Sequence, residues 1–486
     1  MLQTYRAARC AFALCLLLTV IAAARPAAAL QAGPPPTNTP RLTAIPTSSP
    51  RPTKSETPTR PPTVTRTPLP TSVILGTYET PVQAPVAPIP LPLPPPKATG
   101  DDVVVVMLLG SDTITSGTAS RTDVIILASV NRTAGTVALV HIPRDLYVYV
   151  PNYTMVKINT VMNYGNTKYG EGKGAKLLKE TILYNLGIKI DFFARVDFVS
   201  FQALIAKLGG LDISVDCALE DWKLKAPNLT YGDPESWQKV ILNVGRHKMD
   251  PYTALWYSRS RMSSSDFERG RRQEDVLRAM WRQGRAAGVF AQVTDLWPEI
   301  QKTVETDMNL QDVLGLAPVG VSIDPQNVQR IDLAPGVQFH YQNDLGAYGL
   351  LVIPEGMSEA MTNFLLPPSP NRLNGESPKI EIGAGLAYKG LDQVGGDRLS
   401  WEGFNVKVLG TEGMVNRTST TIIDYTGNAK PASLQALIKL LRTSKSQVIQ
   451  KPDPNATVDF HIEMGRDYAS CLHPLPKDTS IPTPGN

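Results

Sequence analysis

Histidine and cysteine, the side chains that most often bind zinc, are scarce in this chain of 486 residues. The five histidines are scattered and, together with four cysteines, offer no zinc-ligand spacing. The sequence has neither the Gly-x-Ser-x-Gly elbow of many hydrolases nor a nucleotide-binding P-loop. The net charge is only +4, and basic residues do not alternate with aromatic ones, so we expect no binding of nucleic acid. What remains is chemistry based on carboxylates and arginines.

The N-terminus indicates export. Arg6 and Arg9 precede an apolar run over residues 10–24. At about 1.5 Å per residue, a helix of this length is shorter than a hydrocarbon core of about 30 Å. This favours a secretory signal peptide, although an uncleaved short membrane anchor fits the same residues. We assign residues 1–32 to one of these two, and we expect the rest of the chain to be extracytoplasmic.

Residues 33–100 are rich in proline, threonine and serine and have almost no apolar periodicity. Such a segment cannot bury a core, and proline keeps it extended, so we expect a disordered linker.

Two cysteines remain in the mature chain, Cys217 and Cys471, because the other two belong to the export segment. An oxidising compartment allows a disulfide between them. They fall in different predicted domains, however, and two buried free thiols are at least as good an expectation.

In residues 101–335 the pattern predicts a first domain in which strands alternate with helices. The run 103–109 is apolar and β-branched and ends at Gly-Ser-Asp, as buried strands of α/β sheets do at their ligand-binding edge. Further strands are predicted at 124–130, 137–142 and 211–215, and helices at 174–186, 198–208, 250–257 and 269–284. This order indicates a layered α/β domain, with α+β as the alternative.

Arginines are concentrated in two short stretches of this domain. Residues 257–261 read Tyr-Ser-Arg-Ser-Arg, and residues 266–273 read Asp-Phe-Glu-Arg-Gly-Arg-Arg-Gln. Upstream lie His-Ile-Pro-Arg-Asp at 141–145 and the acidic residues Asp112 and Asp123. Guanidinium groups bind phosphate oxygens in pairs and stay charged at any working pH, so the pattern favours a site for a multiply charged phosphate ester. A solvated basic face is the plainer alternative.

Seven motifs, taken in order, resemble those of the LytR-CpsA-Psr (LCP) family and cover roughly residues 101–335. They are Gly110-Ser111-Asp112, Arg121-Thr122-Asp123, Ile142-Pro143-Arg144-Asp145, Lys157-Ile158-Asn159 with Tyr164-Gly165, Val196-Asp197-Phe198 with Leu208-Gly209-Gly210, Tyr257 through Arg261, and Asp266 through Gln273. The resemblance implies a layered α/β catalytic domain with a central mixed sheet flanked by helices. It also implies an extracytoplasmic, metal-dependent phosphotransferase. Such an enzyme moves a glycopolymer, for example a teichoic acid or another polysaccharide, from a polyprenyl-pyrophosphate carrier at the membrane surface to a cell-wall acceptor, commonly peptidoglycan.

The resemblance also implies a role for each matching residue. Asp112 and Asp123 would hold Mg²⁺ or Mn²⁺, because hard divalent ions take oxygen ligands and share them with phosphate. With Arg144 they form the expected catalytic set. The expected substrate-binding residues are Arg144, Lys157, Arg259, Arg261, Asp266, Arg269, Arg272 and Gln273; of these, Asp266 and Arg269 are expected to orient the arginines.

The sequence departs from the family pattern at Ile114, where relatives often have arginine, and at Thr122, where serine is usual. The first change removes a cation, and the second is conservative. Plainer interpretations also exist: Asp123 could form a surface pair with Arg121, worth under about 1 kcal/mol, and His141 is expected to be a packed core residue.

An apolar block surrounds the helix predicted at 198–208 and includes Phe192, Val196, Phe201 and Leu204. Composition alone favours an ordinary core. The resemblance implies a long apolar groove or tunnel for the prenyl chain near the phosphate site. Both interpretations hold if one face of the helix packs and the other lines the tunnel.

We place a linker region at 336–376, which contains a proline-rich break at 366–370. Residues 377–475 then predict strands at 379–382, 404–409, 420–423 and 458–462 and a helix at 432–441. They resemble, more weakly, the LytR C-terminal domain. No catalytic cluster is recognisable there, so we expect a small α/β accessory domain, followed by a disordered tail at 476–486.

Two other functions fit the same sequence. A non-enzymatic, wall-associated binding protein could keep the fold without turnover, although a pure binder need not keep an acidic pair beside the arginines. A polyprenyl-pyrophosphate hydrolase would use water as the acceptor on the same fold.

Overall fold

The computed structural model describes residues 85, 87–97, 100–112, 121–229, 233–261, 265–323, 327–342, 347–367, 376–411 and 413–471. The predicted export segment, the predicted linker as far as residue 84 and the predicted tail lie outside these residues. In the described part of the chain, no helix combines the length and the apolar character needed to cross a membrane.

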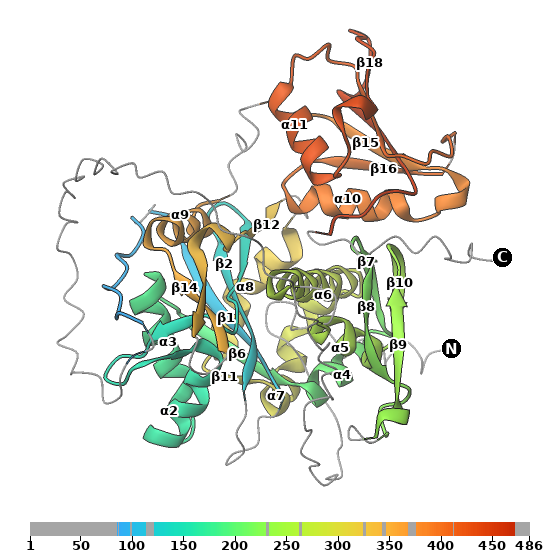
Figure 1. The fold of residues 1–486 in the computed structure, drawn as a ribbon. Helices are drawn as coiled ribbons and strands as arrows, with labels where there is room; N and C mark the ends of the chain where they lie inside the picture. The colour runs from blue at the N-terminus through green and yellow to red at the C-terminus, as the bar shows by residue number, and fades with distance from the viewer. Residues whose placement is uncertain are drawn as a thin grey trace, which may run out of the picture.

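A six-stranded mixed sheet forms the centre of the first domain (Figure 1). Its strand order is β11-β6-β1-β2-β3-β12; β1 pairs in parallel with β6 and antiparallel with β2, and β3 pairs in parallel with β12. The strands are β1 (Val103–Ser111), β2 (Thr122–Asn131), β3 (Thr136–His141), β6 (Phe192–Asp197), β11 (Glu305–Thr306) and β12 (Val328–Ile331). The predicted central mixed sheet is therefore confirmed.

Both faces of this sheet are buried at its centre, because β1 is apolar over residues 103–109 and β2 over residues 124–128. Along β1 the residues 104, 106 and 108 belong to one core cluster and the residues 105, 107 and 109 to the other. Successive side chains of a strand point to opposite faces, so a continuous apolar run needs cover on both sides. Helices α4 (Phe198–Lys207), α5 (Pro251–Arg259), α6 (Asp266–Ala286), α7 (Val293–Thr303) and α8 (Leu310–Ser322) cover the first face, and α2 (Val161–Tyr169), α3 (Gly174–Leu186) and α9 (Pro354–Leu365) cover the second.

Four two-stranded ribbons surround this layered core. They are β4 (Tyr147–Tyr149) with β5 (Met155–Lys157), β7 (Leu211–Val215) with β10 (Gly245–Met249), β8 (Leu219–Leu224) with β9 (Trp237–Leu242), and β13 (Val337–Gln342) with β14 (Ala347–Val352).

The first domain extends beyond its predicted ends. Residues 87–97 fall in the predicted disordered linker, yet Leu93 is buried and its amide donates to the Tyr184 carbonyl at 2.9 Å. On the other side, β13, β14 and α9 occupy much of the predicted linker 336–376, and Met357 and Phe364 of α9 are buried in the second core. The linker prediction was wrong for these residues, because short elements that each bury a few side chains give little periodic signal.

Residues 376–411 and 413–471 form a smaller α/β domain, as predicted, with a core of its own. Its five-stranded sheet has the order β16-β15-β19-β17-β18. The strands are β15 (Ile380–Ala384), β16 (Val406–Gly410), β17 (Thr421–Asp424), β18 (Val448–Gln450) and β19 (Phe460–Met464), and the helices are α10 (Leu391–Trp401) and α11 (Pro431–Leu440).

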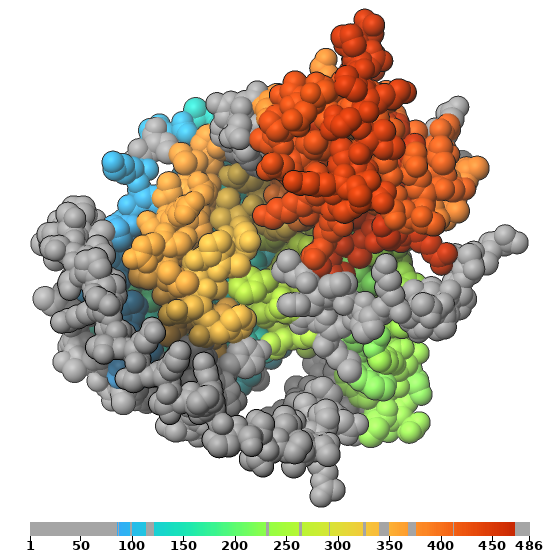
Figure 2. Space-filling view, turned by 45° about the horizontal axis from the view of Figure 1, so that its top comes forward, coloured from blue at the N-terminus to red at the C-terminus, as the bar shows by residue number. Residues whose placement is uncertain are grey.

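The second domain rests on the first as a separate lobe (Figure 2), and a disulfide joins the two. Cys217 and Cys471 are bonded, with their Cα atoms 4.8 Å apart across a sequence separation of 254. Of the two states left open by the sequence, the structure has the disulfide.

Candidate phosphate-binding site

The two predicted metal ligands lie at the same end of the β1–β2 pair. A β-bulge interrupts the pairing between Gly110 and Ser111, and it leaves Asp123 without a partner residue on β1. A bulge redirects the extra side chain, and the Asp123 side chain is 39% exposed. Asp112 directly follows Ser111 and is exposed. The strand register therefore brings these two acidic residues to one edge of the sheet.

Arg144, in the loop after β3, binds Asp123. Its Nη1 donates to Asp123 Oδ2 at 2.8 Å, and Asn159 Nδ2 donates to Asp123 Oδ1 at 3.1 Å. Burial alone would lower the pKa of Arg144, but the charges of Asp123 and Asp145 outweigh burial and raise it. Arg144 is therefore held cationic at the bulge.

Asp145 is the centre of the cationic cluster. Its carboxylate accepts a hydrogen bond from Lys157 Nζ at 2.8 Å and forms longer ion pairs with Arg144 Nε at 3.5 Å and Arg261 Nη2 at 3.7 Å. Burial alone would raise the pKa of Asp145, but the hydrogen bond from Lys157 and the charges of these three cations lower it. Three predicted phosphate ligands, far apart in the sequence, thus meet at one carboxylate.

The C-terminal end of α5 contributes two arginines that are held in different ways. The Arg259 guanidinium lies 4.2 Å from the centroid of the Phe198 ring, and its side chain is exposed. Arg261 is anchored by its backbone amide, which donates to Asp221 Oδ2 at 2.7 Å, and its guanidinium pairs with Asp145. Among the described residues no carboxylate pairs with Arg259. Because a guanidinium stacked by its face keeps its N–H donors at the edge, Arg259 is more available to a ligand than the three cations at Asp145.

Arg272 and Gln273 were also predicted to contact phosphate, but they are buried behind α5. Arg272 Nε donates to the Tyr257 carbonyl at 3.1 Å, and its Nη2 donates to the Ser260 carbonyl. Gln273 Nε2 donates to the Ser258 carbonyl at 3.1 Å. These carbonyls lie where a helix end leaves acceptors without intrahelical partners. Both side chains therefore support the end of α5, and Gln273 also lines an apolar hollow.

Asp266 and Arg269 form an ion pair in the first turn of α6. Burial, together with Arg261 and Arg144, lowers the pKa of Arg269 to about 10 against the opposing charge of Asp266. The next residue, Gly270, allows α6 to approach β3, because a Cβ atom there would lie 2.3 Å from the ring of His141. His141 is a packed core residue, as predicted, and burial lowers its pKa to about 4.

An apolar hollow of about 570 Å³, partly open to solvent, is bordered by Arg259. Its walls come from β1, β2, β6, α4, α5 and α6. Val196, Phe198 and Phe201 of the predicted apolar block line it, whereas Leu204 packs in the core. Part of this block thus packs in the core and part lines a hollow, and the binding of a prenyl chain there stays a prediction.

Three residues of the cluster were missed from the sequence. Asp145 and Asn159 stood inside the motifs that pointed to Arg144 and Lys157, so their positions were the available signal. Asp221 lies on β8, in a ribbon with no distinguishing pattern, and only the folded chain brings it to Arg261.

Residues 87–351 match the model of the LytR_cpsA_psr family. The polyisoprenyl-teichoic acid–peptidoglycan teichoic acid transferase TagT of Bacillus subtilis is 27% identical over 238 residues, which are 48% of this chain and 68% of that protein. The regulatory protein MsrR of Staphylococcus aureus is 30% identical over 183 residues, which are 37% of this chain and 49% of that protein. The matched part thus spans about two thirds of TagT and about half of MsrR.

Solved structures also resemble part of the chain. The crystal structure of B. subtilis TagT has 25% identity and a TM-score of 0.41 and covers 55% of this chain and 91% of its own. A structure of TagT with bound octaprenyl pyrophosphate has 24% identity and a TM-score of 0.39, and it covers 58% of this chain and 98% of the TagT chain. TM-scores this low add nothing to the assignment, which rests on the family model and its cover of more than half of the sequence. The chain belongs to the LytR-CpsA-Psr family.

Proposed function

We propose that this protein is an extracytoplasmic phosphotransferase that moves a glycopolymer from a polyprenyl-pyrophosphate carrier onto a cell-wall acceptor, with peptidoglycan as the first candidate, through a phosphodiester bond. One observation carries the proposal: Arg259 borders an apolar hollow, and Arg261, two residues further along the chain, belongs to the cation cluster at Asp145. A polyprenyl pyrophosphate has the same two parts, a long apolar chain and a multiply charged head. A soluble phosphate ester would use the cations but not the hollow.

The cations suit a pyrophosphate because they are held in place before it binds. Arg144 and Lys157 are fixed by Asp123 and Asp145, and Arg261 by Asp145 and Asp221. Phosphoryl transfer needs mainly alignment and stabilisation of charge on the transferred group. Preorganised donors provide both without reorganisation during the reaction. We assign Arg144, Lys157, Arg259 and Arg261 to the phosphates, and Arg272 and Gln273 to positioning of α5.

The bulge region fits a hard divalent cation such as Mg²⁺ or Mn²⁺. Asp112 and Asp123 offer carboxylate oxygens, and Asn159 Oδ1 is a buried amide oxygen without a hydrogen-bond partner among the described residues. Such oxygen donors suit Mg²⁺, which keeps several waters and shares phosphate oxygens. The described residues contain no group of three or more His, Cys, Asp or Glu side chains that could hold a metal. Phosphate oxygens and water would therefore complete the set, and the bound ion would neutralise charge on the pyrophosphate.

The proposed step forms one bond and breaks one bond. The oxygen of an acceptor hydroxyl attacks the phosphorus that carries the glycan, and the bridging P–O bond to the lipid phosphate breaks. Polyprenyl phosphate leaves with the bridging oxygen, and the hydroxyl proton passes to water. Arg259, at the mouth of the hollow, lies where the leaving phosphate would gain charge.

Two findings support this direction and location. The name of TagT describes the transfer of teichoic acid from a polyisoprenyl carrier to peptidoglycan. The Cys217–Cys471 disulfide is typical of a compartment outside the cytoplasm. Neither finding identifies the glycopolymer that this protein would transfer.

The test uses the purified protein with Mg²⁺, a polyprenyl-pyrophosphate-linked glycan and peptidoglycan fragments. Mass spectrometry should detect a glycan–peptidoglycan phosphodiester together with free polyprenyl phosphate, and excess chelator should remove both. Release of both lipid phosphate and glycan phosphate without attachment would assign a hydrolase instead. Lipid binding with no product would assign a binding protein. Either result would rule out the proposed transferase activity.

A further inference from the structure

We propose that Trp401, the last residue of α10 in the second domain, forms the far wall of the prenyl channel and limits the length of the carrier chain that the protein accepts. This inference rests on the proposed function, because it assumes that the apolar hollow holds a prenyl chain. It assigns to the second domain a role in substrate selection.

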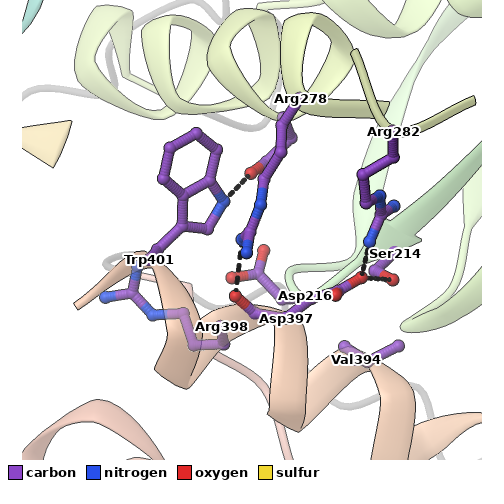
Figure 3. A pocket seen from close by; sticks show the side chains of 9 residues that line it. Ser214, Asp216, Arg278, Arg282, Val394, Asp397, Arg398 and Trp401 are labelled. Atoms are coloured by element: carbon purple, nitrogen blue, oxygen red, sulfur yellow. Dashed lines mark hydrogen bonds and ion pairs between the residues drawn. The ribbon is translucent and has the colours of Figure 1, made fainter. Parts of the chain in front are cut away.

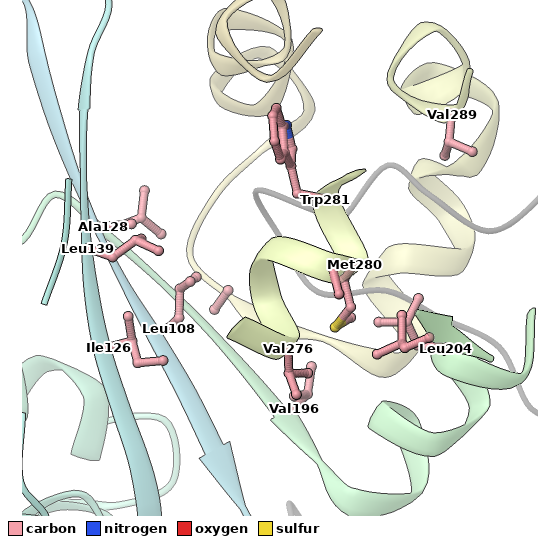
Figure 4. Packing of buried hydrophobic residues seen from close by; sticks show 14 of the residues in the cluster. Leu108, Ile126, Ala128, Leu139, Val196, Leu204, Val276, Met280, Trp281 and Val289 are labelled. Atoms are coloured by element: carbon pink, nitrogen blue, oxygen red, sulfur yellow. The ribbon is translucent and has the colours of Figure 1, made fainter. Parts of the chain in front are cut away.

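A second hollow adjoins the one at Arg259. The second hollow, of about 580 Å³, shares Leu108 of β1 and Leu277 of α6 with the first. On α6 the first hollow is lined by Gln273 and the second by Trp281. From residue 273 to residue 281 a helix rises about 12 Å. The two hollows therefore follow one another between the sheet and α6, where Figure 4 shows Leu108 and Trp281 on facing sides.

Trp401 stands at the end of this path. It lines the second hollow and is 3% exposed. It also belongs to the core cluster of the first domain; the other fully buried members of that cluster all lie between residues 104 and 328. Among the described residues of the second domain, this one side chain is thus built into the first domain's core.

Contacts from α6 hold Trp401 firmly. Its Nε1 donates to Asp275 Oδ1 of α6 at 2.8 Å, and the Arg278 guanidinium lies 4.5 Å from the centroid of its ring. Arg278 Nη1 also donates to the Asp397 carbonyl at 2.8 Å, and Arg282 Nη1 donates to Asp397 Oδ2 at 2.7 Å. Figure 3 shows both arginines descending from α6 toward α10, with Arg278 beside the indole and Arg282 near Ser214. These contacts fix the wall in position.

Charged space lies behind this wall. Trp401 and Arg278 line the second hollow and also a separate polar pocket of about 300 Å³ between the domains. Asp216, Asp397 and Arg398 are among the residues of that pocket. An apolar chain that passed the indole would have to enter a charged interface and break its hydrogen bonds, which is costly. The indole therefore separates apolar from charged space, and the prenyl chain stops there.

The experiment measures kcat/KM of the full-length protein for polyprenyl-pyrophosphate glycans that differ only in prenyl length. Trp401→Leu should shift the ratio of long-chain to short-chain kcat/KM upward by about tenfold or more, since one methylene in an apolar pocket is worth at least that in discrimination. Trp401→Phe keeps most of the bulk and should retain the wild-type profile. Ala128→Leu, which fills the second hollow from β2, should shift the ratio the other way. Phe404→Leu, in the separate core of the second domain, controls for loosening of that domain and should leave the profile unchanged.

The outcomes separate this inference from the proposed function. If Ala128→Leu shifts the profile and Trp401→Leu does not, the channel holds the prenyl chain but Trp401 is not its wall. Trp401 is likewise excluded as the wall if Phe404→Leu reproduces the effect of Trp401→Leu. If the wild-type protein binds no polyprenyl pyrophosphate of any length, the proposed function itself fails. Should Trp401→Leu fail to fold, Trp401→Met takes its place, and the same upward shift is expected.

Discussion

The candidate site and the joint between the domains are both rich in arginine, and both draw on α6, yet they use these residues in opposite ways. In the site, the Arg144 and Arg261 side chains are 19% and 36% exposed although they pair with carboxylates. At the joint, Arg271 is only 10% exposed and pairs with both Asp216 and Glu268. The arginines of the site thus stay more accessible to a ligand than Arg271 does. Arginine density alone therefore does not define a ligand site; the accessibility of the arginines has to be known as well.

The carboxylates differ in the same way. In the site the cations lower the pKa of Asp145 in spite of its burial. At the joint, burial raises the pKa of Glu274 to about 8 although Arg330 lies 3.6 Å away. Carboxylates of the site are thus balanced by accessible cations, and Glu274 is not. A substitution in the site should therefore lower activity and leave stability unchanged, whereas a substitution at the joint should lower stability and leave activity unchanged. We expect the largest effect to be the loss of activity in the site.

Removal of the bulge carboxylate should break the site and spare the fold. Asp123→Ala is expected to reduce transfer by about 100-fold or more, the usual loss for a preorganised electrostatic group, because Arg144 loses its anchor and the bulge loses a metal ligand. Release of polyprenyl phosphate measures the effect. Asp102→Ala is the matched control, since Asp102 makes an exposed ion pair with Arg132 at the other end of the β1–β2 pair. Equal activity in the two variants would make Asp123 a surface residue.

Removal of a carboxylate from the joint should do the reverse. Asp397→Ala leaves Arg282 without its carboxylate acceptor and removes the negative charge beside Arg278, whose hydrogen bond to the backbone carbonyl of residue 397 remains. Breaking such a largely buried pair costs about 3 kcal/mol. Urea unfolding should show the loss, while kcat for the shortest accepted carrier should stay within about twofold, a change worth under about 0.5 kcal/mol. Glu299→Ala, which breaks the exposed Glu299–Lys302 pair, should change stability by less than about 1 kcal/mol. A loss of activity with unchanged stability would contradict the division between the two regions.

The most available cation of the site should matter for the ligand and not for the fold. Arg259→Lys keeps the charge but loses the planar fork, so turnover should fall about tenfold, with Arg259→Ala more severe. Because no described carboxylate pairs with Arg259, neither change should lower the melting temperature of the free protein. The gain in melting temperature from added polyprenyl pyrophosphate should shrink in both variants. A full gain in Arg259→Ala would show that the ligand binds elsewhere.

Sequence patterns predicted the strands and helices of this protein better than the side-chain contacts between them. Continuous apolar runs indicated β1 and β2, and the helix predicted at 174–186 is found with those bounds as α3. The motifs located Arg144, Lys157 and Arg261, because spacing in the family pattern carries that information. The shared contacts at Asp145 and Asp221 could not be predicted, since they join residues that are distant in sequence.

The same limit explains why Arg272 and Arg259 looked alike. Both follow the motif, and both are arginines within a turn or two of other arginines. Only the packing of α6 behind α5 buries Arg272 against backbone carbonyls and leaves Arg259 exposed. Burial of a charged side chain depends on tertiary structure, and periodicity along one helix does not record it.

The buried carboxyl of Glu274 should make the stability of the joint depend on pH. Burial raises the pKa of Glu274 from its usual 4.5 to about 8, with Asp275 adding to the rise and Arg330 opposing it. Between these two values Glu274 binds more protons in the folded protein than in the unfolded chain, so its contribution to the free energy of unfolding falls as pH rises from about 5 to about 8. Glu274→Gln replaces the carboxyl with a neutral amide of the same shape, and it should flatten this slope and stabilise the protein at pH 8 to 9.

Asp145 works in the opposite sense, because its pKa is lowered from 3.8, so its contribution is lost only below that value and does not enter the window. Urea unfolding of both proteins from pH 5 to pH 9 measures the slope, with Glu299→Gln as the exposed control. Parallel slopes for wild type and Glu274→Gln would mean that the joint holds an ionised, balanced carboxylate, as the candidate site does.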